Sequence, residues 1–201
     1  MNYQKSNITK LTVLAVLSAI VAVISFIPLK TMGLEITFSM VPIAVGAILY
    51  GPAVGAILGG VFGIVSFLQC FGYSAFGALL LSESPYFTFL VCVPTRILAG
   101  LVTGIISKAM QKGNKTVNEF RFVAGSLIAP LLNTVFFMST LVALFYKGDT
   151  IQYFVNALGA ANPFIFIILF VGINGLVEII AGFVVAYPVS RGAYQGLKGY
   201  L

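Results

Sequence analysis

An apolar stretch of the chain, residues 36–72, reads ITFSMVPIAVGAILYGPAVGAILGGVFGIVSFLQCFG and contains no charged residue. It is too long for one membrane-spanning helix, which needs about 20 residues. Gly51-Pro52 lies near its middle, where glycine permits a turn and proline can begin the next helix. The stretch therefore predicts two membrane helices, at about residues 36–50 and 53–72, joined by a tight turn.

The rest of the chain has the same apolar character. Of its 201 residues, 60% are hydrophobic and 8% are charged, whereas a soluble domain carries about a quarter charged residues. We expect further membrane helices at about residues 11–29, 86–107, 122–146 and 164–188. The prediction is an all-α integral membrane protein with six transmembrane helices, folded as a single membrane domain over residues 1–201.

The basic residues predict the orientation of these helices, because Lys and Arg favour cytoplasmic loops. With six spans and a cytoplasmic N-terminus, Lys30 and Lys147 lie outside. The inner side then holds Lys5, Lys10, Lys108, Lys112, Lys115, Arg121, Arg191 and Lys198. This asymmetry predicts that both termini are cytoplasmic, and it explains the net charge of +6 without nucleic acid.

Several functional classes are excluded by residues that the chain lacks. It has no His and no Trp, and its two cysteines, Cys70 and Cys92, lie inside apolar runs. These absences argue against a His-based metal site, a Ser-His-Asp triad and a disulfide framework. The sequence also has no Gly-x-x-x-x-Gly-Lys-Ser/Thr phosphate loop. We expect no enzymatic activity, no metal and no cofactor in this chain.

Small residues recur at helical spacing in two predicted helices. Gly51, Gly55, Gly59 and Gly63 are four residues apart and share one helix face. Small residues let helices approach closely in lipid, so this face either packs inside the bundle or forms a groove for a partner.

The first predicted helix carries Ala15, Ala19 and Ala22. This alanine stripe either packs within the bundle or provides a smooth surface against which another subunit slides.

Two ionisable residues, Arg96 and Glu178, lie at membrane depth. An unpaired charge there costs about 2.5–3.5 kcal/mol or more, so such residues face the interior and find a partner or a ligand. Two hypotheses follow. Arg96 and Glu178 form an ion pair that joins two helices, or Arg96 binds a ligand carboxylate through its guanidinium fork.

Four polar amides belong to three of the predicted helices and to the loop before one of them, and aromatic residues lie near the outer ends of the third and fourth predicted helices. This arrangement is typical of a small polar pocket with apolar walls. The candidate substrate-binding residues are Arg96, Asn133, Asn174, Gln69, Glu178, Asn162 and Tyr73.

Two segments resemble a known family. Ala15-x-x-x-Ala19 and residues 36–52, which end in Gly-Pro, resemble the substrate-binding (S) components of energy-coupling factor (ECF) vitamin transporters. Residues 63–67, 94–100 and 133–135 most resemble the pantothenate type. After Asn133-Thr134-Val135 the chain departs from that type, continuing as Phe136-Phe137-Met138, which alters the pocket.

This resemblance implies a transport subunit of the prokaryotic plasma membrane. It would bind one vitamin from outside with high affinity, in a pocket among the outer halves of the last three membrane helices, under the loop between the first two. Its partners would be a membrane coupling subunit and two ATP-binding cassette ATPases, which alone use ATP. The S component would topple in the membrane, with Ala15, Ala19 and Ala22 as its docking surface.

Two alternatives remain. The chain could be an S component for another vitamin, of the riboflavin or pyridoxine type, or a membrane scaffold without transport activity.

Overall fold

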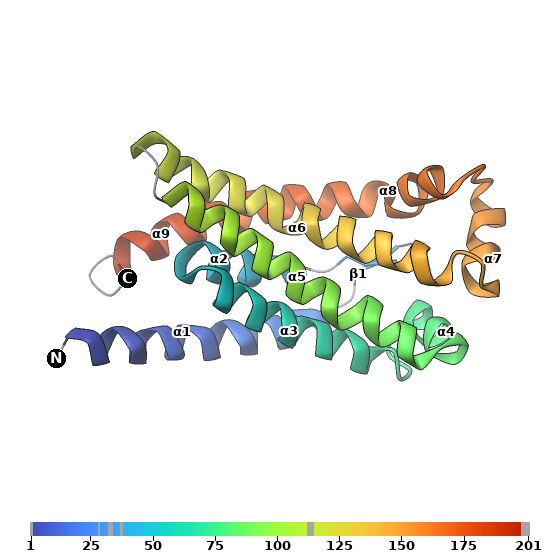
Figure 1. Ribbon diagram of the computed structural model, residues 1–201, viewed down its shortest axis with the longest axis horizontal. Coiled ribbons are helices and arrows are strands. Elements are labelled where there is room, and N and C mark those ends of the chain that lie inside the picture. Colours follow the sequence, from blue (N-terminus) through green and yellow to red (C-terminus); the bar gives the residue numbers. More distant parts are fainter. Residues whose placement is uncertain (1, 28, 32–33, 37, 112–114, 198–201) are drawn as a thin grey trace.

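The computed structural model describes residues 2–27, 29–31, 34–36, 38–111 and 115–197 of the chain. In this part, long helices lie side by side in an elongated bundle (Figure 1). The predicted all-α architecture is confirmed. In chain order the elements are α1 (Asn2–Ser25), β1 (Leu29–Thr31), β2 (Leu34–Ile36), α2 (Met40–Tyr50), α3 (Pro52–Gln69), α4 (Ala75–Glu83), α5 (Pro85–Gln111), α6 (Lys115–Phe145), α7 (Asp149–Leu158), α8 (Pro163–Ala181), the π-helix η1 (Gly182–Ala186) and α9 (Tyr187–Leu197).

The helices are long enough for a multi-pass membrane protein. Five helices of the described part are long and apolar enough to cross a membrane, or six if the bent pair of α7 and the first half of α8 counts as one span. The start of α1 and the end of α9 lie at the same end of the bundle, opposite α4 and α7 (Figure 1). This arrangement fits an even number of crossings, and the cytoplasmic placement of the termini stays a prediction.

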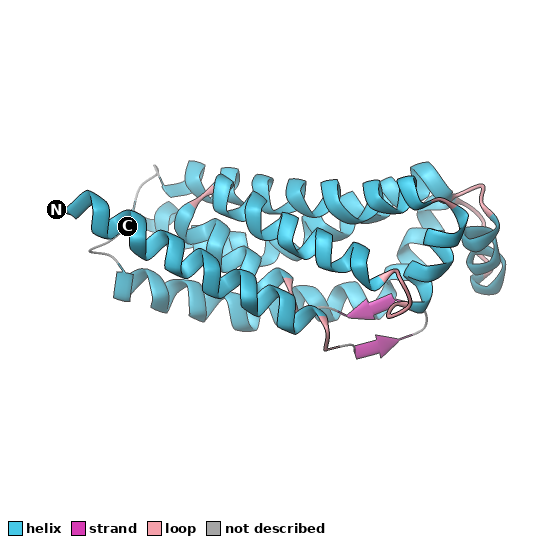
Figure 2. Ribbon diagram, turned by 90° about the horizontal axis from the view of Figure 1, so that it is seen from below, coloured by secondary structure: helices cyan, strands magenta, loops and turns pink. Residues whose placement is uncertain are grey.

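The prediction for residues 36–50 is wrong in its extent. α2 begins at Met40 and has 11 residues, which at 1.5 Å per residue is about half of a 30 Å hydrocarbon core. The residues before it pair instead in an antiparallel hairpin, with Leu29 opposite Ile36. Figure 2 shows this hairpin beside the helices. The first predicted helix accordingly ends earlier, at Ser25 rather than residue 29.

The last predicted helix, residues 164–188, is interrupted. Gly172 lies inside α8 with φ 39° and ψ −127°, a backbone conformation that glycine tolerates and other residues rarely adopt. The chain then continues through the π-helix η1 and α9 as far as Leu197. The two segments that separate predicted helices at residues 73–85 and 147–163 contain the short helices α4 and α7.

The glycine face of α3 packs inside the bundle. A Cβ atom at Gly55 would overlap the carbonyl oxygen of Gly100 on α5, and one at Gly59 would overlap the carbonyl oxygen of Arg96. Gly63 lies against the backbone of Val93 in the same way. Of the two interpretations of this face, internal packing is therefore confirmed. Gly51 instead forms the turn between α2 and α3, with φ 84°.

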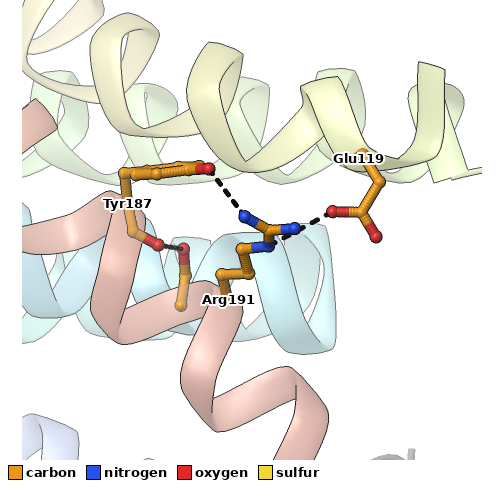
Figure 3. Close-up of polar contacts among 4 residues, drawn as sticks. Glu119, Tyr187 and Arg191 are labelled. Carbon is orange, nitrogen blue, oxygen red and sulfur yellow. Dashed lines mark hydrogen bonds and ion pairs between the residues drawn. The ribbon is translucent and has the colours of Figure 1, made fainter. Parts of the chain in front are cut away.

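The C-terminal helix is joined to α6 by polar and aromatic contacts. Arg191 on α9 forms an ion pair with Glu119 on α6 at 3.3 Å and donates a hydrogen bond to the Tyr187 hydroxyl at 3.1 Å (Figure 3).

Arg121 on α6 is 1% exposed. Its guanidinium carbon lies 4.7 Å from the ring centroid of Phe122 and 4.6 Å from that of Tyr194. Such cation–π contacts stabilise a buried guanidinium.

We expect Glu119→Gln to lower the free energy of unfolding by less than about 1 kcal/mol. The ion pair is half exposed (48% and 49%), so water screens its attraction. The melting temperature in detergent at low and high salt measures the effect. A drop of many degrees that salt does not diminish would contradict this prediction.

Candidate functional site

Five helices surround a cavity in the half of the bundle that contains α4. About 910 Å³ of space free of atoms lies between them, a volume that includes space open to the surroundings. Its wall is formed by Phe62, Ser66, Gln69, Cys70, Ser74, Phe76, Gly77, Leu80, Cys92, Arg96, Asn133, Thr134, Phe137, Met138, Val171, Gly175 and Glu178. Seven of these 17 residues are polar or charged, namely Ser66, Gln69, Ser74, Arg96, Asn133, Thr134 and Glu178.

Arg96 on α5 is the cation of this cavity wall. It is 7% exposed, and its Nη1 donates a hydrogen bond to the carbonyl of Val91 at 2.8 Å. The rings of Phe62 and Phe137 lie 5.3 and 4.3 Å from the guanidinium carbon. Among the described residues, its Nε has no hydrogen-bond partner. The aromatic rings therefore hold the guanidinium in place while leaving it hydrogen-bonding capacity.

Glu178 on α8 lines the same cavity, and its carboxylate attracts the Arg96 guanidinium electrostatically. The structure thus brings together the two intramembrane ionisable residues that the sequence singled out. Both hypotheses for them, the ion pair and the ligand site, require this proximity.

Two predicted amides also line the cavity. Asn133 on α6 is 8% exposed, and its Oδ1 has no hydrogen-bond partner among the described residues. A buried amide oxygen without a partner is costly, so this atom is suited to accept a hydrogen bond from a ligand. Gln69 at the end of α3 donates a hydrogen bond from Nε2 to the carbonyl of Ser25 at 2.6 Å. This bond fixes the end of α1 against the cavity wall.

Two other predicted site residues have structural contacts and do not line the cavity. The Asn162 side chain caps α8, accepting a hydrogen bond from the Ile165 N–H at 2.9 Å. The Tyr73 hydroxyl donates to the carbonyl of Phe26 at 2.7 Å, and their rings meet edge to face. The side chain of Asn174 lies outside the described residues. The geometry gives no support to Asn162 or Tyr73 as ligand contacts, and their assignment stays a prediction.

Some residues of the cavity wall were not among the predicted site residues. Ser66, Cys70, Cys92 and Thr134 are examples. The sequence spacing could have indicated three of them, because Ser66 and Cys70 are four residues apart and Cys92 is four residues before Arg96. Residues at this spacing share a helix face.

The alanine stripe lies on the outer face of α1. Ala15 and Ala19 are exposed and Ala22 is half-buried, whereas Val21 is buried. α1 uses its opposite face to pack against α2 and α3. Packing inside this bundle therefore does not explain Ala15 and Ala19.

The family described as "ECF transporter, substrate-specific component" matches residues 9–190. The chain belongs to this family. A search of curated protein sequences gives no match to it. This S component is therefore a multi-pass membrane protein and a substrate-binding subunit of a transporter, rather than an enzyme.

Proposed function

We propose that this S component binds pantothenate from the outer side of the membrane with high affinity. Its site is the cavity among α3, α4, α5, α6 and α8. The observation that carries the proposal is the buried Arg96 guanidinium in a largely apolar cavity, because its Nε has no hydrogen-bond partner in the described part of the chain. A buried cation of this kind is stabilised by an anionic ligand, and a guanidinium forms strong hydrogen bonds with a carboxylate.

The other polar groups suit the remainder of pantothenate, which has two hydroxyls and an amide. In this proposal the Asn133 oxygen accepts a hydrogen bond from a hydroxyl or from the amide N–H. Gln69 and Asn174 supply further polar contacts, and Glu178 helps to orient Arg96. Phe62 and Phe137 flank the apolar part of the ligand.

The rest of the proposed function concerns partners and location. The S component acts in the plasma membrane of a prokaryote and docks through Ala15, Ala19 and Ala22 on a membrane coupling subunit. Two ATP-binding cassette ATPases drive the complex, and they alone use ATP. The hairpin β1–β2, which lies against α8, covers the cavity.

A thermal-shift screen tests this function. We expect pantothenate to raise the melting temperature of the purified protein in detergent, because a ligand at a thousandfold excess over Kd stabilises the folded state by about 4 kcal/mol. Pantothenol, in which a hydroxymethyl group replaces the carboxylate, is the matched control and should stabilise the protein far less.

The same screen separates the alternatives. Stabilisation by riboflavin or a pyridoxine-type compound, and not by pantothenate, would identify an S component for another vitamin. No stabilisation by any vitamin of the panel would favour a scaffold role and contradict the proposal.

A further inference from the structure

We propose that Cys70 and Cys92 form a redox-active dithiol in the cavity wall. A small disulfide that enters the cavity converts them to an intramolecular disulfide, and this bond weakens ligand binding beside Arg96. The part concerning ligand binding rests on the proposed function, whereas the chemistry of the two thiols does not.

The two cysteines lie in one small buried cluster, although 22 positions separate them in the sequence (70 and 92). Cys70 follows the last turn of α3 as its C-cap residue, and Cys92 lies on α5. The two side chains belong to one apolar cluster with Val93, and both line the cavity. The close packing of α3 on α5 through glycine brings them together.

Ser66 contacts both sulfurs and fixes their arrangement. The Cys70 thiol donates a hydrogen bond to the Ser66 carbonyl, with a distance of 3.3 Å. The Ser66 hydroxyl donates to the Cys92 sulfur, at 4.0 Å. Ser66 therefore contacts both members of the dithiol, through its carbonyl and its hydroxyl.

The cavity gives reagents access to this pair. Each cysteine is only 4% exposed, yet both line the cavity, so a molecule that enters the cavity meets both sulfurs. The sequence contains two cysteines, so within it each can form a disulfide only with the other. Arg96, one helical turn from Cys92, attracts negative charge on that sulfur, and the thiolate is the form that attacks a disulfide.

The reaction is thiol–disulfide exchange. The Cys92 thiolate attacks one sulfur of the small disulfide, a mixed disulfide forms, the S–S bond of the reagent breaks, and one thiol leaves. The Cys70 thiolate then attacks the Cys92 sulfur and displaces the second thiol. The protein loses two electrons and two protons, and both pass to the reagent, which becomes two thiols.

The new bond changes the site because it ties the end of α3 to α5 one turn from Arg96. Both S–H groups disappear, and with them the hydrogen bond that the Cys70 thiol donates to the Ser66 carbonyl. Gln69, the neighbour of Cys70, moves with the end of α3. We therefore expect oxidised protein to bind pantothenate at least tenfold more weakly than reduced protein.

Mass spectrometry of the intact wild-type protein tests the dithiol. Protein in detergent is treated with bis(2-hydroxyethyl) disulfide and then with iodoacetamide. We expect a mass loss of about 2 Da, no alkylation of either cysteine, and full reversal by dithiothreitol. Two independently modified cysteines, or two cysteines that stay reduced and alkylate freely, would overturn the proposal.

The variants C70S and C92S serve as controls. Each retains one thiol, so it should hold the reagent as a stable mixed disulfide. The wild-type assay decides the question even if a variant does not fold.

The binding arm compares pantothenate affinity before and after oxidation. We expect the affinity of wild type to fall at least tenfold and that of C70S/C92S, whatever its starting value, to stay unchanged on treatment. Equal affinity of reduced and fully oxidised wild type would overturn the effect on binding. If reduced wild type does not bind pantothenate, the proposed function fails, while the mass measurement still decides whether the dithiol exists.

Discussion

Arg96→Ala is expected to weaken pantothenate binding by about 2–5 kcal/mol, which is roughly 30-fold to several thousandfold in Kd. The variant removes the only basic side chain of the cavity wall as described and leaves the ligand carboxylate without a charged partner. Isothermal titration calorimetry in detergent measures the change. The affinity for pantothenol should fall much less, because that compound has no carboxylate to lose a partner.

Arg191→Ala is the matched control, since it removes a half-exposed arginine of α9 that lies outside the cavity. It should bind pantothenate like wild type.

The competing hypothesis, an ion pair that locks α5 to α8, makes a different prediction. Arg96→Ala would then unfold the protein, because Glu178 would be left without its cation, and Arg96→Ala/Glu178→Ala would regain stability. A folded Arg96→Ala variant with unchanged pantothenate affinity would contradict the role of Arg96 in binding.

The parts of the site that the sequence predicted share one physical cause. Charged and amide groups at membrane depth must face the protein interior, and the interior of a helical bundle is narrow. Arg96 and Glu178, with Asn133 and Gln69, therefore line one cavity, although they belong to four different helices.

Asn162 shows that one amide in a sequence can have two interpretations, a ligand contact and a helix cap. Asn followed by Pro is typical of a helix start, because Asn caps the first turn and proline occupies its first position. The structure contains this cap. The same signal could have indicated the structural role before any geometry was known.

The short α2 could not be predicted from apolarity. Residues 36–50 are apolar enough to lie in a bilayer, but apolarity does not fix where a helix begins. Leu34–Ile36 pairs with Leu29–Thr31, and such pairing depends on a partner strand rather than on local hydropathy. The break at Gly172 is similar, because glycine is common in membrane helices and most instances do not interrupt them.

Gly59→Ala is expected to lower the free energy of unfolding by about 1–3 kcal/mol or more. The added methyl group would overlap the carbonyl oxygen of Arg96, which belongs to rigid helix backbone. The clash is relieved only if α3 and α5 move apart, and this movement also displaces Arg96. Pantothenate binding should therefore weaken together with stability. A thiol-reactive dye that reports exposure of the buried Cys70 and Cys92 on heating measures the melting temperature.

Gly60→Ala is a matched control one residue away. A Cβ atom there would make an ordinary contact with the Ile97 side chain, at 3.6 Å, and alanine favours the helix over glycine by about 1 kcal/mol. This variant should be as stable as wild type or more stable, with unchanged pantothenate affinity. Equal melting temperatures for Gly59→Ala and Gly60→Ala would mean that the close contact of α3 with the Arg96 backbone does not hold the two helices together. If Gly59→Ala instead loses both thermal stability and pantothenate affinity, the contact that holds α3 against α5 also positions Arg96 for the ligand.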